Sequence, residues 1–359
     1  MQRSIFVAVV TAFITTLASA QRLPRFLCGG DVSEIPQVEA AGGHFSYQGQ
    51  QQDPFAIMKK AGWNFVRFRL WNDPKGGLCD KDYTLKLAKR AHDQGLNVSL
   101  DFHYSDWWAD PGKQYMPAAW KSLSFDDLVK ATYDYTKDVV SAMSAQGTAP
   151  VMVQVGNEIT SGMLWPAGQL HGEDEASWKK LAALIDAGIR AVHDSPGGRH
   201  ILTMIHLDRG GDNKGARWWF DHLAKYHVNF DLIGLSYYPY WHGHIAGMEQ
   251  NVDDLARRYH KDIYLVETAY PWTPERGPQS DSAHLEAGFP ASPEGQAAFL
   301  KELKRIVRDM PDHRGKGLLY WAPTWIPTGG KTTGWGTLAT FDYNGNALPA
   351  VDELSAKAP

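Results

Sequence analysis

Residues 64–103 contain the pattern that decides the fold. They begin with Asn64-Phe65-Val66-Arg67-Phe68-Arg69-Leu70 and end with Asn97-Val98-Ser99-Leu100-Asp101-Phe102-His103. Both runs are short and rich in β-branched and aromatic residues, which is typical of buried strands. Between them, a helical stretch at residues 82–94 stops at Gly95, a residue that commonly ends helices. A strand, a helix and a second strand in this order predict a parallel βαβ unit.

The same alternation continues along the chain after residue 25. Strands are predicted at residues 26–30, 64–70, 97–103, 151–158, 201–206, 231–238, 262–268 and 317–322. Helices are predicted at residues 53–62, 82–94, 125–145, 177–192, 214–226, 252–259, 292–310 and 352–356. Eight strands, each followed by a helix, predict an α/β fold of the (β/α)8 TIM barrel type.

An open, doubly wound sheet is the rival architecture. It usually has a glycine-rich turn, G-x-G-x-x-G, after its first strand. The first strand here leads into Gly29-Gly30-Asp31-Val32-Ser33, which lacks that pattern. No linker, low-complexity segment or repeat divides the chain, so we predict one catalytic domain over residues 21–359.

The composition of the 359 residues excludes several classes of protein. A hydrophobic share of 43% is enough to build a core, which argues against intrinsic disorder. Lys and Arg number 36 against 40 Asp and Glu, and the net charge is −4, so we expect no nucleic-acid partner. The 14 tryptophans are unusual. They belong either to the core or to a surface that stacks on flat apolar faces.

The first 20 residues have the features of a secretory signal peptide. Arg3 provides the positive start, residues 5–14 are mostly apolar, and Ala18-Ser19-Ala20 is a small-x-small cleavage site. The apolar run is shorter than the roughly 20 residues that span a bilayer. We therefore expect a secreted protein, extracellular or periplasmic, with no membrane association. Export would permit a disulfide between Cys28 and Cys79, and the sequence leaves that bond and buried free thiols equally open.

Two glutamates end predicted strands at the edge where TIM barrels place their catalytic groups. Glu158 ends the fourth strand and Glu267 ends the seventh, so their carboxylates should face each other across the barrel mouth. Glycoside hydrolysis needs such a pair, with one carboxyl protonated and the other ionised. We expect Arg69, with Arg67 as a second candidate, to keep Glu267 ionised by its charge. Tyr238 is expected to donate a hydrogen bond to Glu267.

Two other chemistries compete for the same strand ends. A metal site would use His103, His206 and Asp208 as ligands, but no tight spacing such as His-x-x-x-His accompanies them. We therefore predict no metal and interpret the two histidines as side chains that hydrogen-bond a sugar. A serine hydrolase would need a Gly-x-Ser-x-Gly turn, which the chain lacks.

Many of the tryptophans follow these strand ends, and their positions predict a groove there for a sugar chain. Sugars have apolar C–H faces that pack on aromatic rings. Tryptophans on helical stretches, at positions 178, 218 and 219, are interpreted as core. The expected groove set is Trp71, Trp107, Trp108, Trp165, Trp241, Trp272, Trp321 and Trp325.

Over nearly its whole mature length the chain resembles glycoside hydrolase family 53, a family of endo-β-1,4-galactanases within a clan of retaining barrel glycosidases. The blocks that carry the resemblance are Gly29–Ser33, Val66–Asn72, Asp101–Pro111, Gln154–Ile159, Gly162–Pro166, Ser236–Pro239, Val266–Trp272 and Tyr320–Pro323. Among them, Asp-Phe-His-Tyr-Ser-Asp at 101–106 and Gly-Asn-Glu-Ile at 156–159 are highly specific.

The resemblance implies roles for individual residues. Glu158 would be the general acid/base and Glu267 the nucleophile of a double displacement with retention, their carboxyls about 5–5.5 Å apart. Asn157 would bind the sugar 2-hydroxyl, and Arg69 and Tyr238 would flank the nucleophile. Strict alternation places Asn157 and Glu158 on opposite faces, so the strand must end or bulge before them. Further substrate contacts are expected from His103, His206, Asp208, Trp272, Trp321 and Trp325.

The substrate that the resemblance implies is the galactan of type I arabinogalactan, and we expect a monomer without cofactors. Another retaining barrel endoglycanase, acting on mannan, xylan or glucan, is the nearest alternative, and a sugar-binding barrel without catalysis is a weaker one. Some members of the family have a calcium site in the loop after the seventh strand. Asp281, His284 and Glu286 offer too few of the six to eight or so oxygens that calcium takes, so we expect none.

Overall fold

Eight parallel strands close into a barrel in the computed structural model, which describes residues 26–275, 285–330 and 333–357. Around the ring the strand order is β1-β12-β11-β10-β9-β6-β5-β4. The prediction of a (β/α)8 TIM barrel is confirmed. The barrel strands are β1 (Leu27–Asp31), β4 (Phe65–Leu70), β5 (Asn97–Phe102), β6 (Met152–Val155), β9 (Leu202–Leu207), β10 (Leu232–Ser236), β11 (Asp262–Glu267) and β12 (Gly315–Trp321).

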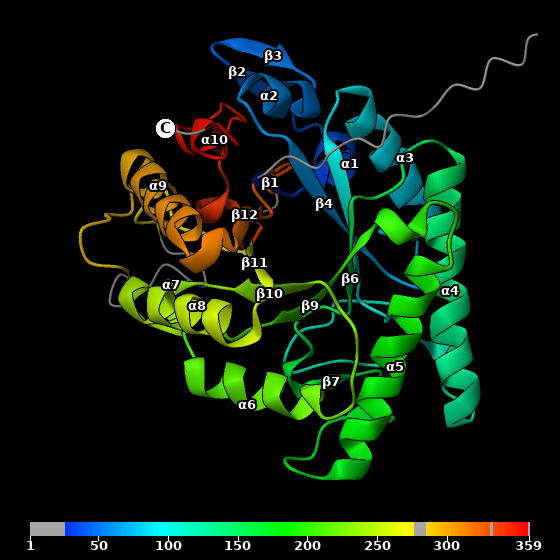
Figure 1. Cartoon of the computed structure of the whole chain (residues 1–359). Coiled ribbons are helices and arrows are strands. Elements are labelled where there is room, and N and C mark those ends of the chain that lie inside the picture. The colour runs from blue at the N-terminus through cyan, green and yellow to red at the C-terminus, as the bar shows by residue number, and fades with distance from the viewer. Residues whose placement is uncertain (1–25, 276–284, 331–332, 358–359) are drawn as a thin grey trace, which may run out of the picture.

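Helices surround the ring of strands on its outside (Figure 1). Two short hairpins accompany them, formed by β2 (Phe45–Tyr47) with β3 (Gln50–Gln52) and by β7 (Gly162–Met163) with β8 (Gly168–Gln169). The helices are α1 (Ile35–Ala40), α2 (Pro54–Lys60), α3 (Lys81–Asp93), α4 (Phe125–Ala145), α5 (Glu175–His193), α6 (Asn213–Ala224), α7 (Pro239–His242), α8 (Ile245–Tyr259), α9 (Pro293–Asp309) and α10 (Ala350–Glu353).

Helix ends follow local chemistry that the sequence displays. Helix α2 begins where the Asp53 side chain accepts hydrogen bonds from the Phe55 and Ala56 amides, with Pro54 at the first helical position. Helix α8 begins at Ile245, earlier than the predicted 252, because Ile245 and Met248 extend its buried face by two turns.

The interior of the barrel has an apolar layer below a polar one. Phe65, Met152 and Met204 belong to a buried cluster inside the ring. Two residues further along the same strands lie Arg67, Gln154 and His206, all buried. Side chains two apart point to the same face of a strand, so each strand contributes to both layers. The polar layer lies towards the C-terminal ends of the strands, directly beneath the barrel mouth.

Two strands end two or more residues earlier than predicted, and both differences matter for the site. Strand β6 stops at Val155, not at Glu158, because Gly156 takes a positive φ of 88° and turns the chain. Strand β10 stops at Ser236, and its pairing with β11 shifts register between Leu235 and Ser236. Such a bulge re-aims the side chains that follow it.

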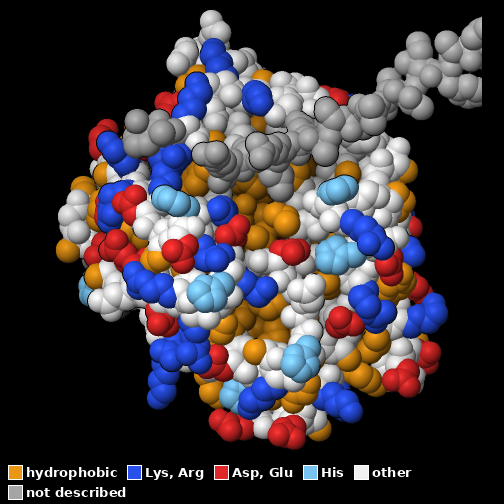
Figure 2. All heavy atoms as spheres, in the orientation of Figure 1, with side chains coloured by type: hydrophobic (Ala, Val, Ile, Leu, Met, Phe, Trp, Pro, Cys, Tyr) orange, Lys and Arg blue, Asp and Glu red, His pale blue; other side chains and the backbone are white. Residues whose placement is uncertain are grey.

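Other sequence predictions concern the two cysteines, the signal peptide and membrane association. Cys28 and Cys79 are both buried free thiols, so the disulfide does not form. The predicted signal peptide, residues 1–20, lies outside the described residues. Across the part of the chain that the structure describes, no helix is long and apolar enough to cross a membrane. On the face drawn in Figure 2, acidic and basic side chains are interspersed.

Candidate active site

The turn after β6 brings two consecutive residues, Asn157 and Glu158, to the barrel mouth. Gly156 makes the turn possible, since a Cβ there would lie 2.5 Å from Cγ2 of Ile159. Glu158 itself has a φ of 46°, an uncommon conformation for a residue other than glycine. Asn157 is anchored by its Nδ2 group, which donates to the Ala109 carbonyl at 2.8 Å. Thus the condition that the strand must end before Asn157 is met.

Glu267, at the end of β11, accepts hydrogen bonds from two side chains and lies close to a third. Nη2 of Arg67 donates to its Oε1 at 2.6 Å and forms a buried ion pair. The Tyr238 hydroxyl donates to Oε2 at 3.1 Å, as predicted, and Ser236 Oγ lies 3.5 Å from the same oxygen. Burial raises the pKa of Tyr238 well above its usual range, so its hydroxyl remains a donor.

The prediction that Arg69 pairs with Glu267 is wrong, because Arg67 makes that contact. Arg69 lies two residues further along β4 and contacts other partners. Its Nη1 lies 3.3 Å from Asp31 Oδ1 and 3.8 Å from Glu34 Oε2. The guanidinium carbon lies 4.3 Å from the centroid of the Trp108 ring. Arg69 therefore supports an aromatic side chain of the mouth and does not touch the predicted nucleophile.

The electrostatics of the two glutamates differ in the way that acid catalysis and nucleophilic attack require. An oxygen of Glu158 and one of Glu267 lie within 4.8 Å of each other. Burial and the charge of Glu267 raise the pKa of Glu158 well above its usual range. Burial also raises the pKa of Glu267, but the ion pair with Arg67 opposes that rise. Glu158 therefore keeps its proton more readily, and Glu267 ionises more readily.

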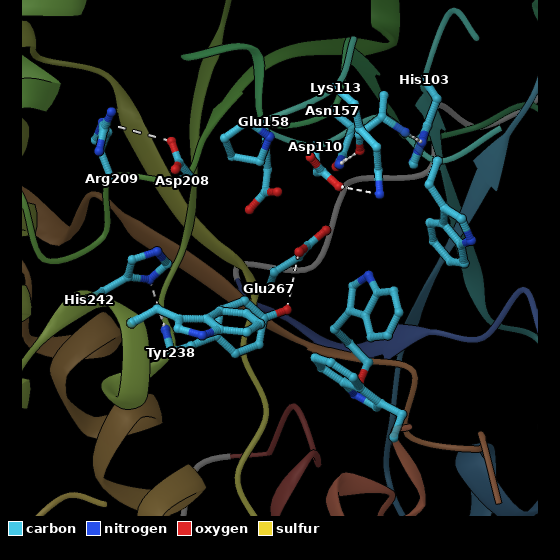
Figure 3. A pocket seen from close by; sticks show the side chains of 16 residues that line it. His103, Asp110, Lys113, Asn157, Glu158, Asp208, Arg209, Tyr238, His242 and Glu267 are labelled. Atoms are coloured by element: carbon cyan, nitrogen blue, oxygen red, sulfur yellow. Dashed lines mark hydrogen bonds and ion pairs between the residues drawn. The ribbon is translucent and has the colours of Figure 1, made fainter. Parts of the chain in front are cut away.

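Both glutamates line a cavity of about 550 Å³ at the mouth (Figure 3). The carboxyl groups of Glu158 and Glu267 point towards each other across it. Two pairs of opposite charge flank them: Asp110 with Lys113 at 3.0 Å, and Asp208 with Arg209 at 3.8 Å. The other lining residues are His103, Trp108, Ala109, Pro111, Asn157, Tyr238, Trp241, His242, Trp321 and Trp335.

The structure gathers some of the predicted substrate contacts in this cavity and leaves others outside its lining. Those in the lining are His103, Asn157, Asp208, Tyr238 and Trp321. Those outside it are Arg69, His206, Trp272 and Trp325. His206 is fully buried, so the expectation that it hydrogen-bonds a sugar fails. Trp272 donates from Nε1 to the Gly336 carbonyl at 3.0 Å, and Trp325 stacks on Trp108 with ring centroids 6.2 Å apart.

The tryptophans divide between core and cavity, although not entirely as predicted. Trp178 and Trp219 on the helices are buried in the core, as expected. Trp71, assigned to the groove from the sequence, is fully buried as well. Its Nε1 donates to Nδ1 of His103 at 3.3 Å, so it supports the mouth from below. Trp241 lines the cavity with 57% of its surface exposed.

One group of side chains has the composition of a metal site: Glu158, His206 and Glu267 offer donor atoms within 4.8 Å of one another. Both ring nitrogens of His206 are already engaged, Nδ1 with Gln154 and Nε2 with Ser236, each at 2.8 Å. The donor set therefore fits a hydrogen-bond network better than a metal. Of the three residues considered for calcium, Asp281 and His284 lie outside the described residues, whereas Glu286 accepts from the backbone N–H of Ile245 at 3.0 Å, so the predicted lack of calcium stays a prediction.

Sequence reasoning missed several residues of the site, among them Gln154, Ser236 and Trp335. Gln154 and Ser236 are buried between the charged groups of the barrel, and Trp335 lines the cavity. Gln154 carried a signal, because it is the polar residue inside the apolar run Met152-Val153-Gln154-Val155. Ser236 carried none, since its orientation depends on the bulge in β10. Trp335 follows a stretch without strand or helix periodicity.

Known proteins are similar to this chain in sequence and in fold. The model of Glycosyl hydrolase family 53 matches residues 27–354. A Niallia circulans protein described as an uncharacterized protein in the bgaB 5' region is 44% identical, over 92% of this chain and 94% of its own length. The arabinogalactan endo-beta-1,4-galactanase of Cellvibrio japonicus is 36% identical, over 96% of this chain and 94% of its own.

A solved structure extends the similarity to three dimensions. The Ignisphaera aggregans GH53 catalytic domain superimposes with a TM-score of 0.84 at 37% identity, covering 93% of this chain and 97% of that one. The family match covers almost all described residues, including both glutamates and the cavity around them. The chain is a glycoside hydrolase and belongs to glycosyl hydrolase family 53.

Proposed function

We propose that the protein is a secreted endo-β-1,4-galactanase that hydrolyses β-1,4-galactosidic bonds in type I arabinogalactan with retention at the anomeric carbon. The observation that carries the proposal is the pair of opposed carboxyls, Glu158 and Glu267, with oxygens within 4.8 Å of each other. Retaining enzymes have carboxyl groups about 5–5.5 Å apart, whereas inverting enzymes need about 6.5–9.5 Å to admit a water. The relatives named galactanases support the choice of substrate.

The proposed reaction has two displacements. Glu267 attacks the anomeric carbon while the bond to the leaving oxygen breaks, and Glu158 gives that oxygen its proton. A water then attacks the same carbon, loses a proton to Glu158, and breaks the bond to Glu267. The products are two shorter chains with one water added, and both glutamates return to their starting states.

Exposed aromatic side chains in and near the cavity support cleavage inside a chain. Trp241 lies at the cavity edge near Tyr238, with ring centroids 5.1 Å apart. Tyr115, 61% exposed, follows Gln114, whose Nε2 group donates to the Asn157 carbonyl at 2.7 Å. We expect sugar units of a bound chain to pack on these exposed rings. No partner chain is required, and we expect a monomer.

Hydrolysis assays on galactan, mannan, xylan and β-glucan test the substrate. We expect reducing ends from galactan, released as oligosaccharides of mixed length, as endo cleavage requires. Activity on mannan or xylan without activity on galactan would identify one of the alternative endoglycanases. Proton NMR of the first products tests the stereochemistry, and initial release of the α-anomer would show inversion.

Substitution of the two glutamates tests the assignment of roles. Glu267→Ala should lower kcat by at least about 10⁴-fold, because no other carboxylate is placed to attack. Glu158→Ala should lose activity on galactan but keep more of it on an aryl galactoside, whose leaving group needs no proton. The matched control is Glu302→Ala on the exposed face of α9, which should retain full activity. Near-normal turnover by Glu267→Ala would refute the mechanism.

A further inference from the structure

A chain of buried hydrogen bonds connects the two catalytic glutamates through the barrel interior. It runs from Glu267 through Arg67, Gln154, His206 and Ser236 to Glu158. Building on the proposed function, we propose that this chain makes Ser236 a positioning residue that directs its hydroxyl proton to Oε1 of Glu158. The catalytic proton of Glu158 is then confined to Oε2.

The direction of the chain is decided at Arg67, since a guanidinium can only donate hydrogen bonds. Nη1 of Arg67 lies 3.2 Å from one terminal atom of the Gln154 side chain, which must therefore be the oxygen, Oε1. The other terminal atom is then the Nε2 group, which only donates. It lies 2.7 Å from a carboxylate oxygen of Asp101, which agrees with that orientation.

The orientation of Gln154 decides which nitrogen of His206 carries the proton. Gln154 Nε2 lies 2.8 Å from His206 Nδ1, and the backbone N–H of Glu158 points to the same nitrogen at 3.4 Å. Asn157 Oδ1, an acceptor, is also 3.1 Å away. Two of these three neighbours are donors, and one of the donors, Gln154 Nε2, is the nearest of the three. Nδ1 therefore accepts, and the proton of the neutral imidazole lies on Nε2.

Burial keeps His206 in this neutral form, because it lowers the pKa of the imidazole well below its usual range. Nε2 then donates to Ser236 Oγ at 2.8 Å. Because a lone pair of Ser236 Oγ accepts this hydrogen bond, the hydroxyl proton of Ser236 is directed to a carboxylate. Glu158 Oε1 lies 2.6 Å away and Glu267 Oε2 lies 3.5 Å away, so Glu158 is the acceptor.

The bulge in β10 makes this arrangement possible. After the register shift between Leu235 and Ser236, Ser236 pairs with Glu267 on the neighbouring strand. The serine is fully buried and lies within hydrogen-bond reach of both carboxyls. Since Oε1 of Glu158 accepts from Ser236, Oε2 is the oxygen left to carry the proton for the leaving group.

This positioning serves both steps of the proposed reaction. In the first, the serine hydrogen bond holds the Glu158 carboxyl in one orientation, so that its proton does not alternate between oxygens. In the second, the same hydrogen bond stabilises the ionised Glu158 that accepts a proton from water. Other charged and titratable groups also face Glu158 and contribute to its titration: Glu267, Asp208, Arg209, Asp110, Lys113, His206 and Tyr238.

The tautomer of His206 can be measured directly in the unmodified protein. We expect the nitrogen chemical shifts of ¹⁵N-histidine-labelled protein, assigned with His206→Gln, to show a neutral ring protonated at Nε2. A proton on Nδ1 would reverse the hydrogen bond to Ser236 and overturn the proposal. This experiment needs no substrate, so it decides the proposal even if the protein does not hydrolyse galactan.

Ser236→Ala tests the catalytic consequence. We expect kcat/KM on galactan to fall about 10- to 100-fold, while bond cleavage in a dinitrophenyl β-galactobioside, measured as the pre-steady-state burst, keeps its rate. The alkaline limb of kcat/KM should move to higher pH, because loss of the hydrogen bond destabilises ionised Glu158. Equal losses on both substrates with an unmoved limb would indicate a merely structural serine and refute the positioning role.

Ser195→Ala provides the matched control. Ser195 is a buried serine whose hydroxyl donates to the Ala191 carbonyl, remote from the carboxyls. Its replacement should leave the pH profile and the ratio of activities on the two substrates unchanged. If wild-type protein cleaves neither galactan nor the aryl galactoside, the proposed function fails, whereas the tautomer of His206 still tests the hydrogen-bond chain.

Discussion

At the scale of single residues, two arginines of one strand have different tasks. Arg67 forms the ion pair with Glu267, and its Nε group donates to Asp31 at 3.1 Å. Arg69 pairs with Asp31 as well, but its guanidinium lies against Trp108. Both side chains are almost fully buried, so each depends on fixed partners for its charge. Their substitution should therefore affect different steps.

Arg67→Lys should impair Glu267, the proposed nucleophile. A lysine keeps the charge but has a single nitrogen, which cannot reach Asp31, Gln154 and Glu267 together. The weakened ion pair should raise the pKa of Glu267, so the acid limb of kcat/KM moves to higher pH and activity falls about 10²-fold. The pH dependence of kcat/KM on galactan measures this. An unmoved acid limb would show that Arg67 does not control ionisation of Glu267.

Arg69→Lys should instead weaken binding. Lysine lacks the planar group that lies 4.3 Å from the centre of the Trp108 ring, so that ring loses its support in the cavity wall. We expect KM for galactan to rise several-fold, with kcat and both pH limbs little changed. Steady-state kinetics beside Arg67→Lys separate the two effects. A shifted acid limb in this variant would contradict the division of tasks.

At the scale of elements, the ends of the strands decide where the chemistry lies. Strand β6 must stop before Asn157, and Gly156 stops it by adopting a φ of 88°. Strand β10 must bulge before Ser236, so that this serine reaches both carboxyls. The regular parts of these strands supply only the interior layers. Each departure from regular pleating thus places a residue of the active site.

Gly156→Ala should reduce both stability and activity. The new Cβ would be strained by the positive φ and would lie 2.5 Å from Ile159 Cγ2, at a cost of about 1–3 kcal/mol in the free energy of unfolding. Because the turn positions Glu158, kcat should fall at least about tenfold. Urea denaturation and galactan assays measure the two effects.

Gly147→Ala controls for the backbone strain alone. Gly147, after helix α4, has a φ of 81°, and a Cβ there would have no other atom within 4 Å. This variant should lose some stability and keep its activity. If Gly156→Ala remains as active as Gly147→Ala, the turn after β6 does not control the position of Glu158.

At the scale of the whole molecule, a layer of buried charged side chains lies above the apolar layer of the barrel. Titration of a buried charged group such as Glu34 should change the free energy of unfolding of the whole protein. Glu34 is fully buried, and its Oε1 accepts from the Thr324 hydroxyl. Burial raises the pKa of Glu34 to about 7, from an ordinary value of 4.5. Between these two pH values the folded protein binds more protons at this site than the unfolded chain does. The contribution of Glu34 to the free energy of unfolding therefore decreases as pH rises through that window.

Glu34→Gln should remove this contribution. Glutamine does not titrate, so the stability of the variant relative to wild type should increase from pH 5 to pH 8, by about 1–3 kcal/mol. Urea denaturation at the two pH values measures the change. Glu294→Gln, an exposed position in the first turn of α9, is the control and should show no such trend. A constant difference between Glu34→Gln and wild type would contradict the assigned titration.

The sequence by itself determined the barrel and the edge at which its candidate catalytic residues lie. Alternating apolar runs and helical stretches specify parallel strands, and the C-terminal ends of such strands meet at one mouth. Glu158 and Glu267 could therefore be paired without coordinates. The end of β6 before Asn157 could also be stated as a condition, because the side-chain period of a strand is two.

Only the tertiary structure decided which neighbours each of these residues has. Arg67, not Arg69, reaches Glu267, and His206 lies beneath the cavity, not in its wall. The bulge before Ser236 and the burial of Trp71 were equally invisible. These outcomes depend on strand twist, register and packing between segments far apart in the chain. Local sequence patterns specify which way a side chain points, but not what it meets there.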